Sequence, residues 1–371
     1  MYHRGVEPRE PAVKVLVCAK TDVGRARETN EDACSVTELA TGQVLDVTGT
    51  DRTLDVGQKG VLLALSDGMG GHQAGEVASA LVLESLGAEL AQDSTAPIHR
   101  HLEDAVQRAN RAVHEAAKSA ERHGMGATLT AVFIRGNEAY IAEVGDSRGY
   151  LLRNGRLRQM TRDQSMVQLL VDQGVLTRED ARRAPGKNVI LQAVGLAPEV
   201  RVAIGRLELR RGDRLMLCSD GVSNQVTDEE LRQILTESPP REACETIIAL
   251  ANERGGEDNE TVIVADVIGD DLDEPVEFES VTSTFEVLQA FEARPHKQRR
   301  RTPPLGAEPP PVPRTRNPAL ESDPEIEILP ALDDADEPTA DEQAPDAVDE
   351  AAKERGWIQS LLSRLSRGQK R

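Results

Sequence analysis

The sequence predicts an α+β fold in which a central antiparallel β-sandwich is flanked on both faces by pairs of helices, four layers in the order αββα. Three observations support this prediction. Strand-like stretches follow one another in meanders joined by short turns, helical stretches come in pairs between them, and the helices have apolar faces that need a sheet to cover them.

Nine stretches have the apolar pattern and the length of β-strands. The connections Arg135-Gly136-Asn137 and Arg153-Asn154-Gly155 are short turn sequences, so the strands that they join should pair antiparallel. In chain order, the predicted strands cover residues 13–19, 33–38, 61–66, 127–134, 138–144, 149–153, 200–209, 215–219 and 261–267.

Five stretches are predicted to be helices. Two long ones lie between the third and fourth strands and two more before the last strand, which suits one helical layer on each sheet. The fourth begins with Thr227-Asp228-Glu229-Glu230, a capping-box pattern that satisfies free N–H groups at a helix start. The predicted helices cover residues 74–90, 98–121, 164–172, 227–235 and 241–254.

The globular pattern occupies residues 13–268 and follows a short N-terminal arm, residues 1–12. Residues 269–350 are rich in proline and in acidic side chains, and residues 321–350 contain thirteen Asp or Glu and no Lys or Arg. Because such a segment repels itself and cannot bury a core, we expect residues 269–350 to be a disordered linker.

Residues 351–371 have the pattern of a short basic amphipathic helix. Trp357, Leu361 and Leu365 recur at helical spacing among Arg and Lys side chains. We expect this helix to dock on a protein partner or on the acidic run of its own chain. An anionic membrane surface is the weaker alternative, because one short helix has little apolar area.

Composition argues against several functional classes. The formal net charge of −20 disfavours nucleic-acid binding, which requires a basic surface. The four cysteines show no spacing typical of a zinc site or of a disulfide framework. We see no leader sequence after Met1 and no apolar run near the roughly 20 residues of a membrane span, so we expect a cytoplasmic protein.

Aspartates stand at the ends of four predicted strands. Asp67 and Asp220 each follow a strand in the tripeptide Ser-Asp-Gly, Asp146 follows a third strand, and Asp258 precedes a fourth. A single Asp-Gly pair is a common turn sequence. Its repetition behind apolar strands instead favours a site for hard divalent cations, which take oxygen ligands, and both Mg²⁺ and Mn²⁺ fit this preference.

Arg27 lies just ahead of Glu31 and Asp32, where the chain enters the second predicted strand. Arginine grips phosphate through paired donors on a planar group, and the two carboxylates could hold cations or the waters bound to them. Taken alone, the same residues could form a plain surface ion pair.

Six short motifs occur in a fixed order along the chain, and together they resemble the metal-dependent protein phosphatase family, also called type 2C, in its bacterial form. The resemblance covers about residues 13–268. It implies a β-sandwich with paired outer helices and the removal of phosphate from serine and threonine side chains by two Mg²⁺ or Mn²⁺ ions. The motifs are residues 27–32, 67–72, 126–128, 145–148, 219–221 and 258–259.

The resemblance also implies roles for particular residues. Asp67 would bridge the two metal ions and the carbonyl of Gly68 would bind one of them, while Asp220 and Asp258 would complete the other. Glu31 and Asp32 would act largely through metal-bound water, and Asp146 with Asp220 would hold a third, looser ion. Arg27 would clamp the substrate phosphate. The expected catalytic residues are therefore Arg27, Asp67 and Asp220, and the expected nucleophile is a hydroxide that bridges the two ions.

Animal members of the family carry a histidine directly after the first Asp-Gly, whereas this chain has Met69. A thioether cannot donate a proton, so a metal-bound water is the expected acid for the leaving alkoxide. We expect His72 to have a structural role at the start of the following helix in preference to direct acid catalysis. The resemblance also implies that residues 163–189 correspond to the variable flap of the family, where we expect the choice of substrate to be made.

The leading functional prediction is a protein phosphatase that acts on phosphorylated Ser/Thr proteins and opposes a cognate Ser/Thr kinase. A relative that dephosphorylates regulators of an anti-sigma pathway would share this chemistry and differ in substrate. An inactive phosphoprotein-binding module would be expected to lack a metal ligand, and none of the motif's ligands is missing here.

Overall fold

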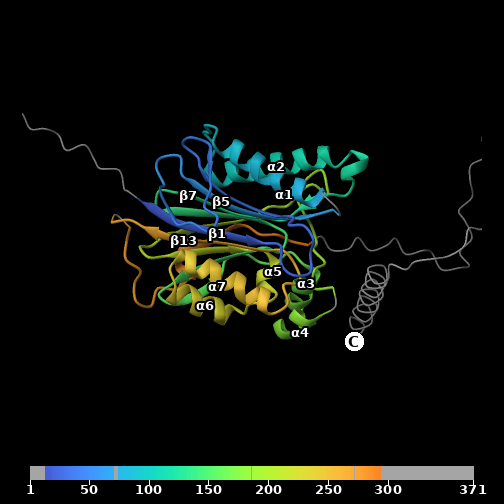
Figure 1. Cartoon of the computed structure of the whole chain (residues 1–371). Coiled ribbons are helices and arrows are strands. Elements are labelled where there is room, and N and C mark those ends of the chain that lie inside the picture. Colours follow the sequence, from blue (N-terminus) through green and yellow to red (C-terminus); the bar gives the residue numbers. More distant parts are fainter. Residues whose placement is uncertain (1–12, 71–73, 185, 271, 294–371) are drawn as a thin grey trace, which may run out of the picture. The chain divides into compact units, whose positions relative to one another are not determined.

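Two antiparallel β-sheets lie face to face at the centre of the part of the chain that the computed structural model describes, residues 13–293 without 71–73, 185 and 271. A pair of helices covers the outer face of each sheet (Figure 1). The predicted four-layer α+β sandwich is therefore confirmed.

Every pairing between the named strands is antiparallel. The first sheet contains, in spatial order, β10 (Arg156–Gln159), β9 (Arg148–Arg153), β12 (Arg214–Cys218), β13 (Glu260–Ile268), β1 (Lys14–Asp22) and β4 (Arg52–Asp55). The second contains β14 (Phe285–Gln289), β11 (Ala203–Glu208), β8 (Glu138–Val144), β7 (Leu129–Arg135), β5 (Val61–Met69), β2 (Asp32–Glu38) and β3 (Gln43–Leu45), and the short β6 (Gly126–Ala127) pairs with the end of β5.

The central strands are buried on both faces, which explains their nearly continuous apolar sequences. On β5, Leu63 and Leu65 point into the core between the two sheets, whereas Leu62 and Ala64 point toward the outer helices. This alternation is what a pleated strand imposes on successive side chains. A strand covered on both sides therefore needs apolar residues at nearly every position.

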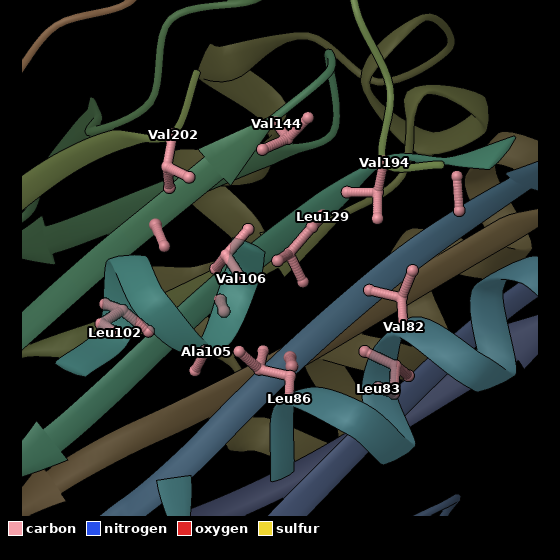
Figure 2. Packing of buried hydrophobic residues seen from close by; sticks show 14 of the residues in the cluster. Val82, Leu83, Leu86, Leu102, Ala105, Val106, Leu129, Val144, Val194 and Val202 are labelled. Carbon is pink, nitrogen blue, oxygen red and sulfur yellow. The ribbon is translucent and has the colours of Figure 1, made fainter. Parts of the chain in front are cut away.

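The helical layers are built as predicted, one on each sheet. α1 and α2 pack on the second sheet, where Leu86, Leu102 and Val106 meet Leu129 and Val202 (Figure 2). α6 and α7 cover the first sheet. The helices are α1 (Ala74–Leu90), α2 (Ile98–Ala116), the 3₁₀ turn η1 (Ala120–Arg122), α3 (Met166–Asp172), α4 (Arg178–Arg183), α5 (Asp220–Ser223), α6 (Asp228–Glu237), α7 (Pro240–Glu253) and α8 (Val281–Thr284).

The domain boundary expected at residue 268 needs correction. β14 adds a strand to the edge of the second sheet by pairing with β11, and the described chain continues to residue 293. Glu279 forms ion pairs with Arg153 and Arg210, and the Arg153 side chain is 1% exposed. The acidic composition that suggests a linker thus includes a carboxylate that pairs with a buried arginine, which Asp213 also binds at 2.6 Å.

Smaller differences concern the ends of elements. The helix expected over residues 98–121 ends at Ala116, and α3 begins after Ser165, whose side chain accepts a hydrogen bond from the N–H of Gln168. The arm 1–12, the rest of the expected linker from residue 294 and the expected amphipathic helix 351–371 lie outside the described residues. Among the described helices, none combines the length and the apolar character needed to cross a membrane.

Candidate active site

Two of the predicted ligands are neighbours because their strands are neighbours. β2 and β5 pair so that Asp32 lies opposite Asp67. The Asp67 backbone is held on its other side by Thr128, which donates its N–H to the Asp67 carbonyl at 2.8 Å and accepts the Asp67 N–H on its hydroxyl at 3.0 Å. Thr128 of the 126–128 motif therefore fixes the position of a predicted ligand.

Asp220 and Asp258 come together where β12 ends and β13 begins. Asp220 is the first residue of α5, and a Cβ on the next residue, Gly221, would lie 2.1 Å from the carbonyl oxygen of Asn259. Only glycine permits this approach of the two backbones. The Gly after the second Ser-Asp is therefore required by packing at the site.

Asp146 occupies the turn from β8 to β9 and is 8% exposed. The side chain of Gln164 accepts a hydrogen bond from the Gly145 N–H at 2.9 Å. Arg148 binds Asp163 through two nitrogens, at 2.7 and 3.0 Å. The loop that carries Asp146 is thus fastened to residues 163–164 at the start of the flap.

One open cleft of about 710 Å³ collects these positions. It is lined by residues from segments far apart in the sequence, and they include all but one of the predicted site residues. The predicted residues that line it are Arg27, Glu31, Asp67, Gly68, Asp146, Asp220 and Asp258. Asp32 is not among the lining residues, and its Oδ2 accepts a hydrogen bond from the Ser219 hydroxyl at 2.7 Å.

The negative charges of the cleft carboxylates are poorly balanced by the positive charges of the described side chains. Burial, followed by the charges of Asp32 and Asp220, raises the pKa of Asp67 well above its usual value. Burial raises the pKa of Asp32 to about 7 and, with the charge of Asp258, the pKa of Asp220 to about 6. Such shifts are expected where several buried carboxylates face one another without enough positive charge.

The donor set fits hard divalent cations. The ligand atoms are oxygens, and Oδ1 of Asp32 is buried with no hydrogen-bond partner among the residues that the structure describes. Within the described part of the chain, no three His, Cys, Asp or Glu side chains close up into a ready-made cage. The carboxylates instead line the walls of an open cleft, an arrangement that leaves room for water and substrate beside an ion.

Arg27 is the cation in the cleft that sequence analysis singles out. Its Nη2 lies 2.9 Å from Oδ2 of Asp258, and its side chain is half exposed. The charges of Asp258 and Glu31 outweigh partial burial and raise the pKa of Arg27. The guanidinium therefore stays charged at the mouth of the cleft, where an incoming anion can reach it.

Two glycines let α1 approach the site closely. A Cβ on Gly68 would lie 2.1 Å from the carbonyl oxygen of Gly75 in the first turn of α1, and a Cβ on Gly75 would lie 2.5 Å from the carboxyl carbon of Glu31. The hydroxyl of Ser79 on α1 donates to the Glu31 carbonyl at 2.6 Å. Glu31 is thus placed by the helix as well as by its own loop.

Asn259 is a positioning residue that sequence analysis does not identify. Its amide nitrogen donates to the carbonyls of Val23 and Thr29, each at 2.9 Å, and its Oδ1 accepts the Glu31 N–H at 2.8 Å. These bonds hold the loop that carries Arg27 and Glu31. Its place directly after Asp258 was the available clue, but the identity of its partners depends on the fold.

Asn188 of the flap and Ile190, which directly follows the flap, also line the cleft and were not predicted individually. The charge of Lys187, from the same segment, lowers the pKa of Asp220 against the larger effect of burial. His72, which was expected at the start of α1, lies outside the described residues.

Comparison with known proteins identifies the family. The sequence model of the protein phosphatase 2C family matches residues 47–252. The chain is 44% identical over 209 residues to the serine/threonine protein phosphatase PstP of Mycobacterium tuberculosis, a match that covers 56% of this chain and 40% of that protein. It is 36% identical over 254 residues to the serine/threonine phosphatase stp of Listeria monocytogenes, covering 67% of this chain and 94% of that protein.

Solved structures of serine/threonine phosphatases have the same fold as this chain. The catalytic domain of PstP in complex with two manganese ions superposes with a TM-score of 0.58 at 38% identity, covering 69% of this chain and 99% of that one. The serine/threonine phosphatase of S. agalactiae gives a TM-score of 0.60 at 33% identity, covering 68% and 98%. The shared fold, the ordered carboxylate motifs and the family match over more than half of the sequence lead to one conclusion: this chain belongs to the protein phosphatase 2C family.

Proposed function

We propose that this chain is a metal-dependent protein phosphatase that hydrolyses phosphoserine and phosphothreonine in proteins. The observation that carries the proposal is the single cleft into which four strand ends and the loop of residues 26–31 bring carboxylates, glycine backbone and an arginine. Membership of the family, and the two manganese ions in the PstP catalytic domain, support the same chemistry.

The carboxylates of the cleft are the proposed ligands of two Mg²⁺ or Mn²⁺ ions. Asp67 would be shared by both, with the Gly68 carbonyl on one and Asp220 and Asp258 on the other, and Glu31 and Asp32 would bind through water. Bound ions of this kind supply a hydroxide nucleophile near neutral pH and positive charge beside the transferring oxygens. A third ion at Asp146 and Asp220 is a further part of the proposal.

Side chains of the protein bind the substrate phosphate and hold the metal ligands and Arg27 in position. In the proposed complex, Arg27 exchanges its contact with Asp258 for two oxygens of the substrate phosphate, a geometry that suits its planar group. The hydrogen bonds of Thr128 hold the backbone of Asp67, and those of Asn259 hold the Arg27 loop, so that both residues are in place before the substrate arrives.

The leaving alkoxide needs a proton from a group other than Met69. Met69 lines the cleft directly after Gly68, and its thioether has no proton to give. We therefore propose that water in the cleft fills this role.

The proposed partners are phosphorylated Ser/Thr proteins and a cognate Ser/Thr kinase, and the proposed location is the cytoplasm. The flap borders the cleft through Asn188 and is the proposed surface for selecting substrates. The segment 351–371 is proposed to bind a protein partner. Removing it should change localisation or turnover, and unchanged values of both would leave this part of the proposal without support.

The test is hydrolysis of a phosphothreonine peptide by the purified full chain, with manganese and with chelator. We expect metal-dependent release of phosphate. Asp220→Ala should reduce kcat/KM by at least a hundredfold, because it removes a proposed ligand of the metal centre. Arg27→Ala should act mainly by raising KM for the peptide, because it removes the phosphate clamp.

A matched control is Asp104→Ala. It removes an exposed carboxylate on α2, a helix that contributes no residue to the lining of the cleft in the described chain. Its activity should equal that of the parent chain. Folded, metal-loaded protein that releases no phosphate from any phosphopeptide, yet still binds it, would refute the catalytic proposal and favour a phosphoprotein-binding module.

A further inference from the structure

A second cavity, of about 390 Å³, opens at one end of the sandwich and shares no lining residue with the cleft. Its walls come from β8, β11 and β14 of the second sheet and from α3, together with residues 160–165 and 289–293. Its volume falls within the range of small-molecule sites in proteins.

Most of the cavity wall is apolar. Ile141, Leu169, Leu191 and Phe285 are among the lining side chains. A Cβ on Gly205 would lie 2.5 Å from the ring of Phe285, so the ring lies directly against the β11 backbone there. An occupant would accordingly bury an apolar body.

Four acidic residues line the cavity, and Glu143 is the most buried of them; the other three are Asp163, Asp172 and Glu292. Glu143, on β8, lines the cavity and is 3% exposed. Its Oε2 accepts the Arg162 N–H at 3.0 Å, whereas its Oε1 is buried without a hydrogen-bond partner in the described chain. A buried, half-satisfied carboxyl group is costly to maintain, so the group that completes it should come from the cavity.

The nearby charges do not compensate Glu143. Among the described residues that line the cavity, Arg162 is the only Lys or Arg, and its guanidinium pairs with Asp172 at 2.5 Å. Asp163, which lines the cavity, already forms an ion pair with Arg148, which does not line it. Glu292, also in the lining, is exposed to water, so among the described lining residues Glu143 is the buried carboxylate that still needs a donor, and a cationic donor would match it best.

We propose that this cavity binds a small apolar molecule with a single cationic donor group, a primary amine or an amidine, which pairs with Oε1 of Glu143. Burial raises the pKa of the Glu143 carboxyl well above its usual value, and pairing with a cation would restore the charged form. The inference goes beyond the proposed function, since no cleft residue takes part in it.

The position of Glu143 suggests what an occupant would affect. The side chain of Gln164 donates to the Glu143 carbonyl at 3.2 Å and accepts the Gly145 N–H, directly before Asp146. Loop 161–164 thus holds both the cavity carboxylate and the Asp146 turn. Binding should make the Gly145 amide exchange more slowly, because it stabilises the loop that holds its acceptor.

The test is calorimetric titration of the full chain with 2-phenylethylamine and with 2-phenylethanol, which has nearly the same shape and no charge. We expect one amine site per chain and at least tenfold weaker binding of the alcohol. Glu143→Gln, which keeps an acceptor for the Arg162 N–H, should weaken amine binding tenfold or more. Hydrogen exchange at Gly145 should slow with the amine in the parent chain.

Two further variants make the result specific. Ala203 lines the cavity and lies opposite Glu143 on the neighbouring strand, so Ala203→Leu fills the cavity beside that carboxylate. This variant should no longer bind the amine. Glu138→Gln makes the same chemical change on the same strand outside the cavity and should leave binding unchanged. If Glu143→Gln fails to fold, Ala203→Leu decides the question.

Three outcomes would overturn the proposal: no binding of the amine by the parent chain at millimolar concentration, equal binding of the alcohol, or undiminished binding by Ala203→Leu. The first would leave ordered water as the partner of Glu143. Each result is read from heat and amide exchange, so a failure of the phosphatase proposal would leave this test intact.

Discussion

Single residues decide the geometry of the cleft mainly through backbone contacts. Gly24, Gly68 and Gly221 each lie where a Cβ would come within 2.3 Å of a carbonyl oxygen of another segment. The carboxylates can converge only because these backbones approach one another. Positions that carry no chemistry are therefore as restrictive as the ligands themselves.

Gly24→Ala tests this point, with Gly124→Ala as its matched control. The two glycines have nearly equal positive φ values, +78° and +79°, so both substitutions carry the same backbone strain of about 1 kcal/mol. At Gly24 the new methyl group would also lie 2.2 Å from the Asp258 carbonyl, whereas at Gly124 it meets no atom within 4 Å.

Thermal unfolding should therefore show that Gly24→Ala loses more stability than Gly124→Ala, with a free energy of unfolding lower by about a further 1–3 kcal/mol. The peptide hydrolysis rate should fall for this variant alone, because Asp258 has to move. Equal losses in the two variants would show that the contact at Gly24 relaxes without cost.

Asn259→Ala tests the loop that carries Arg27. It removes three hydrogen bonds from a residue that is 5% exposed, at a cost of roughly 2–3 kcal/mol, and it frees the loop. Peptide hydrolysis should show a raised KM, because the phosphate clamp is no longer held in place.

Asn110→Ala is the control for Asn259→Ala. Asn110 is fully buried and holds the Gly195 N–H and the Ala197 carbonyl, away from the residues that line the cleft. It should lower the unfolding temperature to a similar degree and leave KM unchanged. A raised KM in both variants would mean that general loosening, and not the Arg27 loop, limits substrate binding.

At the scale of elements, local sequence and long-range contacts cooperate at the start of α6. Thr227 and Glu230 form the capping box that the sequence predicts, and Arg254 at the end of α7 also binds Glu230. Hydrogen bonds from Arg254 and Thr227 lower the pKa of Glu230 to about 2. The cap thus joins the two helices that cover the first sheet.

This contact predicts a pH dependence. A carboxyl whose pKa is lowered by folding stabilises the folded state above its unfolded pKa, near 4.3, and the contribution is lost as the pH falls toward 2. In urea unfolding, the stability difference between the parent chain and Glu230→Gln should be constant above pH 5 and shrink between pH 5 and pH 3. A difference that grows with acidity would contradict the assigned contact. Glu237→Gln, an exposed change in the last turn of the same helix, should show no such trend.

At the scale of the whole molecule, the segment 269–293 belongs to the folded unit. Glu279 and Thr284 bind Arg153 inside the fold, at 3.4 and 2.7 Å, and the ring of Phe285 covers Gly205. Removing this segment would leave a buried guanidinium with fewer partners and expose the edge of the second sheet.

A chain ending at residue 268 should therefore unfold about 5 °C or more below the full chain, because β11 loses its edge partner β14 and Arg153 keeps only its ion pair with Asp213, at 2.6 Å. A chain ending at residue 293 should keep the unfolding temperature of the full chain within about 2 °C. Differential scanning calorimetry distinguishes the two. Equal stability of both truncated chains would show that β14 is dispensable.

Much of the architecture could be predicted because it depends on local pattern. The bounds of α1 and β8 match the predicted ranges, since apolar periodicity and flanking turns define them without outside help. β14 was missed because its neighbours in sequence are acidic and exposed, and its strand conformation depends on pairing with β11. Edge strands of this kind have no complete signature of their own.

By itself, the sequence determined the class of fold, the order of the motifs and the kind of side chain that each motif supplies, because covalent order and apolar periodicity are properties of the chain alone. Only the tertiary structure decided which oxygens meet: that Asp32 lies opposite Asp67, that Asn259 holds the Arg27 loop, and that Glu143, beside a separate cavity, keeps one buried oxygen with no partner in the described chain. The physical reason is that strand register and backbone approach bring together residues far apart in the chain, such as Lys14 and Ile268, and those contacts leave no local trace in the sequence.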